Sequence, residues 1–313
     1  MGTATAEQDF VQTPSQFFSY KDRLEKELAK SLLGFGEKTA LRDACEYALM
    51  GSGKRMRPLI VLLIGEAIGK GLPLYESALC VEFFHTASLI VDDLPCMDDE
   101  EERRNRPALH KVFGEATALL ASYSLLCAAF GKIQENGTLF KQALAPESCF
   151  AEQHTLIAIE HATRLAGILG ATGGQYADLF TTVLSLDTIK KIIYKKTITL
   201  FELSFVLGWL FGGGSVKDLE KVKKTAFHFG LAFQIADDLG DLVQDEKKQR
   251  KVNFARLVGK ERAFSTFEEE MHAYEASLRH LHLETASFKR INLMLWNLAR
   301  NNFAQHKMVR EKG

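Results

Sequence analysis

The sequence has 313 residues, with 39 Lys plus Arg against 40 Asp plus Glu and a net charge of −1. This balance excludes a globally basic nucleic-acid-binding protein, so we expect no nucleic-acid partner. Charged or strongly polar residues interrupt the apolar runs, so we expect no stable insertion into a membrane. The five cysteines have no CxxC spacing and the first residues do not resemble a secretory signal, which favours a cytoplasmic protein.

Helical periodicity dominates the chain, and no alternating strand pattern or internal repeat is found. Residues 1–15 are predicted to form a disordered tail, and residues 16–313 a single all-α domain, a helical bundle larger than four helices. No proline follows Pro146, which permits long helices. The spacing of apolar residues predicts helices over residues 17–33, 42–50, 59–68, 74–91, 107–130, 151–169, 186–211, 218–242 and 263–300.

Two clusters of aspartates continue apolar faces of predicted helices. Asp92 and Asp98 end the helix over 74–91, and Asp237 and Asp241, four residues apart, share one face of the helix over 218–242. Burying a carboxylate is unfavourable unless it is paired or binds a cation, and clustered oxygen ligands suit Mg²⁺. The alternative interpretation is that each acidic run is a solvated helix end.

Basic residues are concentrated in two short segments. Lys54 and Arg57 lie in a glycine-flanked loop over residues 51–58 that can fold around a phosphate. The loop lacks the spacing of a P-loop, and the alternative is a solvated basic turn. Arg103 and Arg104 follow the first acidic cluster, where they either bind a second anion or only balance its charge.

Further polar residues interrupt apolar helices. Lys196 and Thr197 lie inside the helix predicted over 186–211, where Lys196 either extends to solvent or faces a ligand. Thr197 is expected to bond back to the backbone and bend the helix. His85, less than two turns before the first aspartates, is either a satisfied core histidine or part of the site. Gly173 and Gly174 indicate a close approach of another backbone or of a ligand.

Five motifs occur together in one order along the chain. They are GKRMRP at 53–58, DD-x4-D at 92–98 followed by two arginines, GQ-x2-D at 174–178, KT at 196–197, and FQ-x2-DD-x2-D at 233–241. From about residue 31 to residue 300, the sequence therefore resembles the trans-isoprenyl diphosphate synthase family, also called polyprenyl synthetases, of the farnesyl and geranylgeranyl diphosphate synthase type. The resemblance implies an isoprenoid synthase-like fold with a central cavity, a homodimer, and condensation of isopentenyl diphosphate with an allylic diphosphate.

The resemblance also assigns roles to individual residues. It implies three Mg²⁺ ions, bound by Asp92, Asp98, Asp237 and Asp241. The allylic substrate would contact Arg103, Lys196 and Lys251 through its diphosphate and Thr197 and Gln234 along its chain, and Arg103, Lys196, Thr197 and Gln234 would form the catalytic group. The diphosphate of isopentenyl diphosphate would contact Lys54, Arg57, His85 and Arg104.

Product length is expected to depend on the pocket beneath Asp92. Ala87 and Ser88 are small where an aromatic residue would stop the chain at farnesyl length, and Phe84 would form a deeper floor. The sequence therefore favours geranylgeranyl diphosphate as the product, with farnesyl diphosphate as the alternative.

The sequence departs from the family pattern in three places. Val91 replaces the usual histidine before the aspartates, Ile198 replaces the usual glycine after Lys-Thr, and the loop after Asp241 is short. The short loop bears on the role of Lys251 and not on the metal ligands. Two other functions are the alternatives to a prenyl diphosphate synthase. A terpene cyclase also ionises a prenyl diphosphate, although it needs neither the basic loop nor a second complete aspartate motif. A non-catalytic regulatory subunit typically loses one aspartate cluster.

Overall fold

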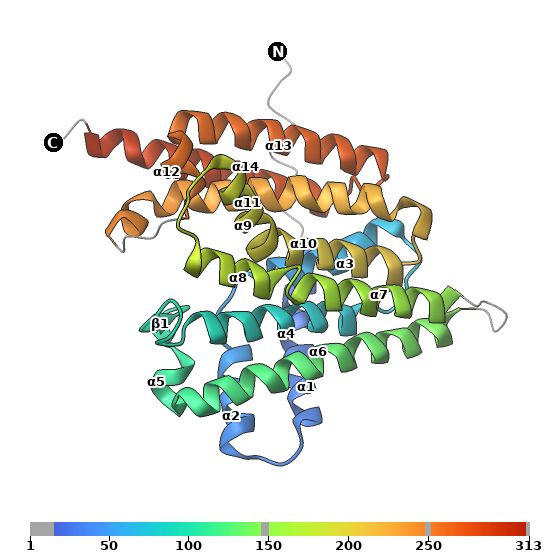
Figure 1. The fold of residues 1–313 in the computed structure, drawn as a ribbon. Coiled ribbons are helices and arrows are strands. Elements are labelled where there is room, and N and C mark those ends of the chain that lie inside the picture. Colours follow the sequence, from blue (N-terminus) through green and yellow to red (C-terminus); the bar gives the residue numbers. More distant parts are fainter. Residues whose placement is uncertain (1–15, 145–149, 248–251, 311–313) are drawn as a thin grey trace.

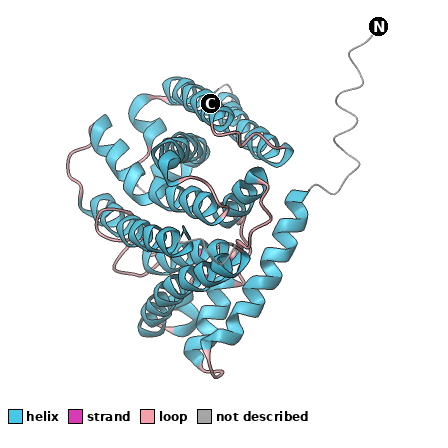
Figure 2. Ribbon diagram, turned by 90° about the vertical axis from the view of Figure 1, so that its right-hand side faces the viewer, coloured by secondary structure: helices cyan, strands magenta, loops and turns pink. Residues whose placement is uncertain are grey.

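The computed structural model describes residues 16–144, 150–247 and 252–310, and almost all of them are helical (Figure 1). Viewed from the side, several long helices are seen nearly end-on, so they run roughly parallel or antiparallel to one another (Figure 2). This confirms the prediction of an all-α fold. The α-helices are α1 (Gln16–Ser31), α2 (Ala40–Leu49), α3 (Met56–Ile68), α4 (Tyr75–Asp92), α5 (Leu109–Phe113), α6 (Glu115–Ala143), α7 (Phe150–Ala166), α8 (Ala171–Phe180), α9 (Leu186–Ile193), α10 (Thr199–Phe211), α11 (Leu219–Lys247), α12 (Phe254–Val258), α13 (Lys260–His280) and α14 (Ala286–Arg310).

Helix starts follow the local chemistry of the sequence. Thr39 and Ser185 cap α2 and α9, each accepting a hydrogen bond from a backbone N–H three residues later. Pro58 lies in the first turn of α3, where its missing N–H costs little. Ser215 accepts a bond from the N–H of Lys217 and caps the short 3-10 helix over Val216–Asp218.

The buried core is centred on α4 and α10. Every residue of α10 is buried, which explains why this helix reads as an almost continuous apolar run. It packs between α3, α4, α7 and α11, and aromatic rings fill the interface with α11. Phe201 lies 5.1 Å from Phe229, ring centre to ring centre, and Phe205 lies 5.9 Å from the same ring. The core therefore holds α4 and α11, which carry the two aspartate clusters, in fixed positions.

The prediction of one helix over 107–130 is wrong in its bounds, because the structure has two helices there, α5 and α6. Glu102–Arg103 (β1) and Arg106–Pro107 (β2) form a short antiparallel pair, joined by Arg104 and Asn105, which both have positive φ. Two-residue turns of this kind match the twist of paired strands. The chain then breaks at Gly114, with φ of 79°, and α6 continues to Ala143.

Two more expected helices differ from the structure. The range 263–300 is split into α13 and α14, because His282 adopts a left-handed φ of 56° between them. The range 186–211 is interrupted by a π-helical turn, η2 (Tyr194–Ile198), so that α9 and α10 are separate helices. The short helix α12 is not predicted from the sequence. The tail predicted for residues 1–15 lies outside the described residues.

One helix among the described residues, α6, is long and apolar enough to cross a bilayer by length and composition alone. Residues 116–131 of this helix carry no charged side chain, and Glu115 and Lys132 bound this run. In the fold, α6 packs along α4 and also contacts α2, α5 and α7. Only 33% of its apolar window is buried in the fold, and one such helix is weak evidence for a membrane span.

Candidate active site

The first aspartate cluster lies where α4 ends. Burial raises the pKa of half-buried Asp92 to about 7, and the charge of Lys196 opposes this shift. The N–H of Asp98 donates to the carbonyl of Asp92 at 2.9 Å, so the chain turns back and brings the two residues together. The Nε2 of Gln175 donates to Asp98 at 3.4 Å. The predicted pair is therefore assembled at one helix end, next to a cation.

Arg103 binds the middle residue of this cluster. Its Nε donates to both carboxylate oxygens of buried Asp93, at 2.9 and 3.1 Å, and its Nη2 also donates to Asp93. Arg103 was expected to contact an allylic diphosphate. In the structure its guanidinium is engaged by Asp93, which ties the hairpin of β1 and β2 to the end of α4.

The second cluster lies on α11. Burial raises the pKa of Asp237 to about 6, and the charges of Lys54 and Arg57 oppose this shift, while Asp241 adds to it. Asp237 therefore faces the basic loop before α3. The face behind it is buried, as the sequence predicts, with Phe233 only 9% exposed.

Asp238, the middle residue of the second cluster, points into the protein. It accepts hydrogen bonds from the N–H of Phe254 at 2.7 Å and from the Nε2 of Gln234 at 2.7 Å. Asn253 donates to its carbonyl at 3.0 Å. Asp238 thus anchors the start of α12 to α11.

Lys196, Thr197 and Gln234 form a connected polar group beside the aspartates. The Nζ of Lys196 lies 2.5 Å from Asp178 and 3.9 Å from Asp98. The lysine is therefore paired inside the site and does not extend to solvent. The hydroxyl of Thr197 donates to Gln234 at 2.7 Å, so the expected bond from Thr197 back to the backbone is wrong. Thr199 makes that bond instead, to the carbonyl of Lys195 at 2.6 Å.

The π-helical turn that carries Lys196 is packed between two glycines. A Cβ on Gly174 of α8 would lie 2.3 Å from the backbone nitrogen of Lys196, and a Cβ on Gly230 of α11 would lie 3.1 Å from the side chain of Ile198. The close backbone approach predicted from the two glycines is confirmed at Gly174. Only residues without side chains allow α8 and α11 to approach the turn so closely.

Several of these groups line one cavity of about 420 Å³, formed by α8, α9, η2, α11 and the segment that follows α4. Both charged and apolar residues line it, and Ile192 and Ile193 are among the apolar ones. One predicted ligand from each aspartate cluster, Asp98 and Asp241, therefore lies at the same hollow as Lys196, whereas Asp92 and Asp237 are not among its lining residues. The full lining is Met97, Asp98, Asp178, Leu179, Ile192, Ile193, Lys196, Thr197, Gln234, Asp238, Asp241, Asp245 and Val252.

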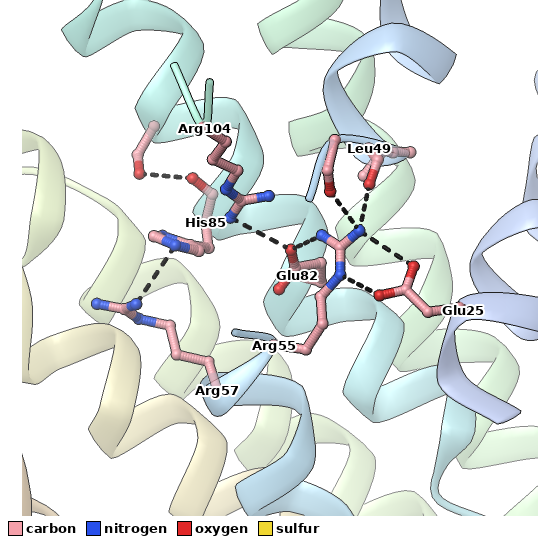
Figure 3. Close-up of polar contacts among 9 residues, drawn as sticks. Glu25, Leu49, Arg55, Arg57, Glu82, His85 and Arg104 are labelled. Atoms are coloured by element: carbon pink, nitrogen blue, oxygen red, sulfur yellow. Dashed lines mark hydrogen bonds and ion pairs between the residues drawn. The ribbon is translucent and has the colours of Figure 1, made fainter. Parts of the chain in front are cut away.

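A second group, formed by Arg57, His85 and Arg104, gathers around the middle of α4 (Figure 3). The Nη1 of Arg57 lies 3.3 Å from the Nε2 of His85, and its guanidinium stacks 4.3 Å over the ring of Phe201. Burial lowers the pKa of Arg57 to about 10 and that of His85 well below its usual value, which leaves the arginine charged and the imidazole neutral at pH 7. The buried Nε of Arg57 has no hydrogen-bond partner among the described residues. Such a donor favours an anionic ligand.

The remaining residues expected here differ in position. Arg104 is half-buried and lies 3.7 Å from Glu82, whereas Lys54 is exposed at the end of the loop. Lys251 lies outside the described residues. Sequence reasoning gave no role to Glu82, and named Gln175 and Asp178 only as parts of a motif. The GQ-x2-D spacing, which places Gln175 and Asp178 on one helix face, was the available signal.

The residues expected to set product length lie along α4 below Asp92. Ala87 is fully buried, Ser88 is half-buried and donates to the carbonyl of His85 at 2.9 Å, and Phe84 packs edge-to-face against Phe130 at 5.2 Å. None of the three is among the residues that line the 420 Å³ cavity. Their role in chain length stays a prediction.

The donor set fits Mg²⁺ bound together with a diphosphate. Asp92, Asp98, Asp237 and Asp241 offer only hard oxygen ligands. Among the described residues, no three His, Cys, Asp or Glu side chains form a preassembled metal site. Mg²⁺ in proteins usually takes one or two carboxylates and completes its shell with water and phosphate, so separated carboxylates on two helices suit it.

A family model described as Polyprenyl synthetase matches residues 38–255. The chain belongs to the polyprenyl synthetase family. Geranylgeranyl pyrophosphate synthase 11, chloroplastic, of Arabidopsis thaliana is 35% identical over 266 residues, which are 79% of this chain and 72% of that protein. Putative geranylgeranyl pyrophosphate synthase 8, chloroplastic, of the same plant is 35% identical over 249 residues, 74% of this chain and 66% of that one, so the chain matches just under two thirds of this relative.

Solved structures of the same fold agree with this family. A geranyltransferase from Legionella pneumophila superposes with a TM-score of 0.76 at 27% identity, over 91% of this chain and 96% of that one. An FPP/GFPP synthase from Zymomonas mobilis gives a TM-score of 0.75 at 27% identity, over 91% and 99%. The predicted isoprenoid synthase-like fold is therefore confirmed.

Proposed function

We propose that this polyprenyl synthetase condenses isopentenyl diphosphate with an allylic diphosphate. The observation that carries the proposal is the shared cavity, in which Asp98, Asp241 and Lys196 meet beside an apolar wall. The group of Arg57, His85 and Arg104, in which the charge of Arg57 acts on Asp237, suits a second diphosphate. Two anionic substrates would therefore meet between α4 and α11.

The proposed reaction begins with loss of the allylic diphosphate. The bond between C1 and oxygen breaks, the electron pair leaves with the diphosphate, and an allylic cation remains. Bound Mg²⁺, held by Asp92, Asp98, Asp237 and Asp241, would supply charge stabilisation for the leaving group. Lys196, positioned by Asp178, would add a positive charge at the same place.

The next step joins the two substrates. The double bond of isopentenyl diphosphate attacks C1 of the cation, and the proton lost from the adjacent carbon goes to the released diphosphate. Thr197 and Gln234, hydrogen-bonded at 2.7 Å, present oxygen dipoles along the allylic chain, where positive charge develops. Ile192 and Ile193 line the apolar side and help keep water from the cation.

The product is proposed to be geranylgeranyl diphosphate, with farnesyl diphosphate as the alternative. The support is that Ala87 and Ser88 leave little side-chain volume on α4 one turn before Asp92. The relatives described above are named geranylgeranyl pyrophosphate synthases, which agrees with this preference.

The active form is proposed to be a homodimer of a single helical domain over residues 16–313. The support is an exposed apolar row on α6, where Leu120 is 52% and Tyr123 55% exposed, with Leu119 and Phe130 beside them. Contiguous apolar surface of this kind commonly marks a subunit interface. The cytoplasm is the proposed compartment, although the two plant relatives are named as chloroplastic enzymes.

The test is incubation of the purified chain with labelled isopentenyl diphosphate, Mg²⁺ and, in turn, dimethylallyl, geranyl and farnesyl diphosphate. Formation of a labelled prenyl diphosphate, abolished by chelation of the metal, is the expected result. Release of diphosphate without consumption of isopentenyl diphosphate would indicate a terpene cyclase. A chain that is inactive alone but active with a catalytic homologue would indicate a regulatory subunit, and either result would refute the proposal.

A further inference from the structure

Glu82 is a buried carboxylate of α4 that two arginines share (Figure 3). Its side chain is 1% exposed, and its Oε1 lies 2.5 Å from Nη1 of Arg55 and 3.7 Å from Nη2 of Arg104. It lies one helical turn before His85, on the same helix. The carboxylate is therefore placed directly behind the basic group that faces Asp237.

Arg55 connects this carboxylate to three other parts of the chain. It donates to Glu25 of α1 at 2.8 Å, to the carbonyl of Leu49 at 2.7 Å and to the carbonyl of Gly51 at 2.9 Å. Its backbone is left-handed, with φ of 51°, although it is not a glycine. A residue keeps such a conformation only when its surroundings fix it, and here the buried side-chain contacts do so.

Arg104 also contacts the loop that precedes α3. Ser52 donates to the carbonyl of Arg104 at 3.1 Å, and a Cβ on Gly53 would lie 3.0 Å from the Cζ of Arg104. The guanidinium thus lies flat against the glycine of the loop that carries Lys54 and Arg57. Glu82 is the one acidic group in this arrangement that contacts both the loop, through Arg55, and Arg104 directly, among the residues described.

We propose that Glu82 is a positioning residue for the binding of isopentenyl diphosphate. It fixes Arg104 and, through Arg55, the loop with Arg57, so that their guanidinium groups are already directed at the diphosphate before it binds. The inference rests on the proposed function, since it assigns this basic group to that substrate. Glu82 itself does not touch the substrate.

The sign of the effect separates this role from simple electrostatics. Removing a negative charge near an anion site would strengthen anion binding if charge alone mattered. Loss of the shared carboxylate would instead release Arg104 and the loop, and binding would weaken. Glu82→Gln keeps the shape of the side chain and removes its charge, so it tests these two expectations directly.

The experiment measures isopentenyl diphosphate binding to the full chain by calorimetry without Mg²⁺, and steady-state kinetics with Mg²⁺. For Glu82→Gln we expect the dissociation constant and the KM of isopentenyl diphosphate to rise about tenfold, equal to about 1.4 kcal/mol. The KM of the allylic diphosphate should change less than twofold. Glu66→Gln, a half-buried carboxylate hydrogen-bonded to Ser287 at the far end of α3, is the matched control.

A second variant keeps the inference falsifiable if Glu82→Gln fails to fold. Glu25 is the more exposed partner of Arg55, and its side chain is 36% exposed. Glu25→Gln removes the charge of this partner and should raise the dissociation constant of isopentenyl diphosphate by a smaller factor than Glu82→Gln does. Unchanged or tighter binding in the folded variant would overturn the inference. Weaker binding in a chain that makes no prenyl product would refute the proposed function and still support the role of Glu82.

If the wild-type chain does not bind isopentenyl diphosphate, inorganic diphosphate is the second probe of the same basic group. Weaker binding of inorganic diphosphate by Glu82→Gln would then support the positioning role. A wild-type chain that binds neither anion would overturn it.

Discussion

Gly174 of α8 lies against the main chain of Lys196, so closely that a Cβ would be 2.3 Å from the lysine nitrogen and 2.6 Å from the carbonyl carbon of Lys195. Both contacts are with backbone, which cannot rotate away as a side chain can. The π-helical turn that presents Lys196 and Thr197 to the cavity is therefore held in place by a residue that makes no contact of its own with the site.

The first prediction concerns this contact. Gly174→Ala should reduce kcat at least about tenfold and destabilise the fold by about 1–3 kcal/mol, because the added methyl group must displace the turn. Steady-state kinetics and urea unfolding measure both effects. Gly131→Ala is the control, since a Cβ there meets nothing within 4 Å and alanine favours the α6 helix. Normal turnover in Gly174→Ala would contradict the role of the turn.

The second prediction concerns the second aspartate cluster. Asp237→Ala should lower kcat by on the order of 10²-fold or more, since it removes a proposed metal ligand that faces Lys54 and Arg57. The melting temperature should remain close to that of the wild type. Asp218→Ala, in the short 3-10 helix just before α11 and paired with Lys221, is the control and should retain full activity. Near-normal turnover would remove Asp237 from the site.

Product length gives the third prediction. Ser88→Phe places an aromatic ring one turn before Asp92 and should shift the main product toward farnesyl diphosphate while turnover continues. The single bond lost, from Ser88 to the carbonyl of His85, lies within α4 and contributes little. Chromatography of the dephosphorylated products measures the change, and an unchanged product would refute the proposed floor.

The exposed row on α6 gives the fourth prediction. Leu120→Lys should convert the proposed dimer to a monomer in analytical ultracentrifugation, because a charge in the centre of an apolar interface is unfavourable. Leu293→Lys is the control, since Leu293 is also exposed, at 58%, but lies on α14. A wild-type chain that sediments as a monomer would contradict the dimer.

The fifth prediction is a pH dependence of stability. Burial, together with the charges of Lys223 and Arg164, lowers the pKa of His161 to about 4. Between this value and the ordinary histidine pKa of about 6.5, the unfolded chain binds a proton that the folded chain does not. The stabilisation is therefore present above pH 6.5 and is lost as the pH falls toward 4, by at most about 1.4 kcal/mol per pH unit.

His161→Gln tests this assignment, because glutamine does not titrate. The free energy of unfolding should fall less between pH 7 and pH 5 in the variant than in the wild type, as measured by urea unfolding at each pH. Equal slopes in the two proteins would show that His161 does not titrate as predicted.

Much of the architecture follows from local patterns. The apolar faces ending in Asp92 and Asp237 predicted that two helix segments bring their carboxylates into the interior. The break between α13 and α14 carries no such signal, because the left-handed residue there is His282 and not a glycine. Gly114 does break its helix, but a single glycine inside an apolar run is equally compatible with a continuous helix.

The polar contacts of the site were harder to predict, because they join distant segments. Glu82 lies among buried residues of α4 and has no neighbouring charge in the sequence, so its two arginines are visible only once α3 and the hairpin are packed against it. Arg103 follows several acidic residues in the sequence, and packing decides that its partner is Asp93, ten residues away and on another element. Sequence spacing identified which residues gather, and packing decided which of them pair.

The middle carboxylates of the two aspartate clusters, Asp93 and Asp238, are both engaged by groups of the protein itself. Asp93 is neutralised by Arg103, and Asp238 is directed to the backbone of α12, so neither presents its full charge to a ligand. Part of the acidic charge in the two motifs is therefore compensated within the protein itself. The number of aspartates in the motifs alone does not give the number of carboxylates on which a bound cation could draw.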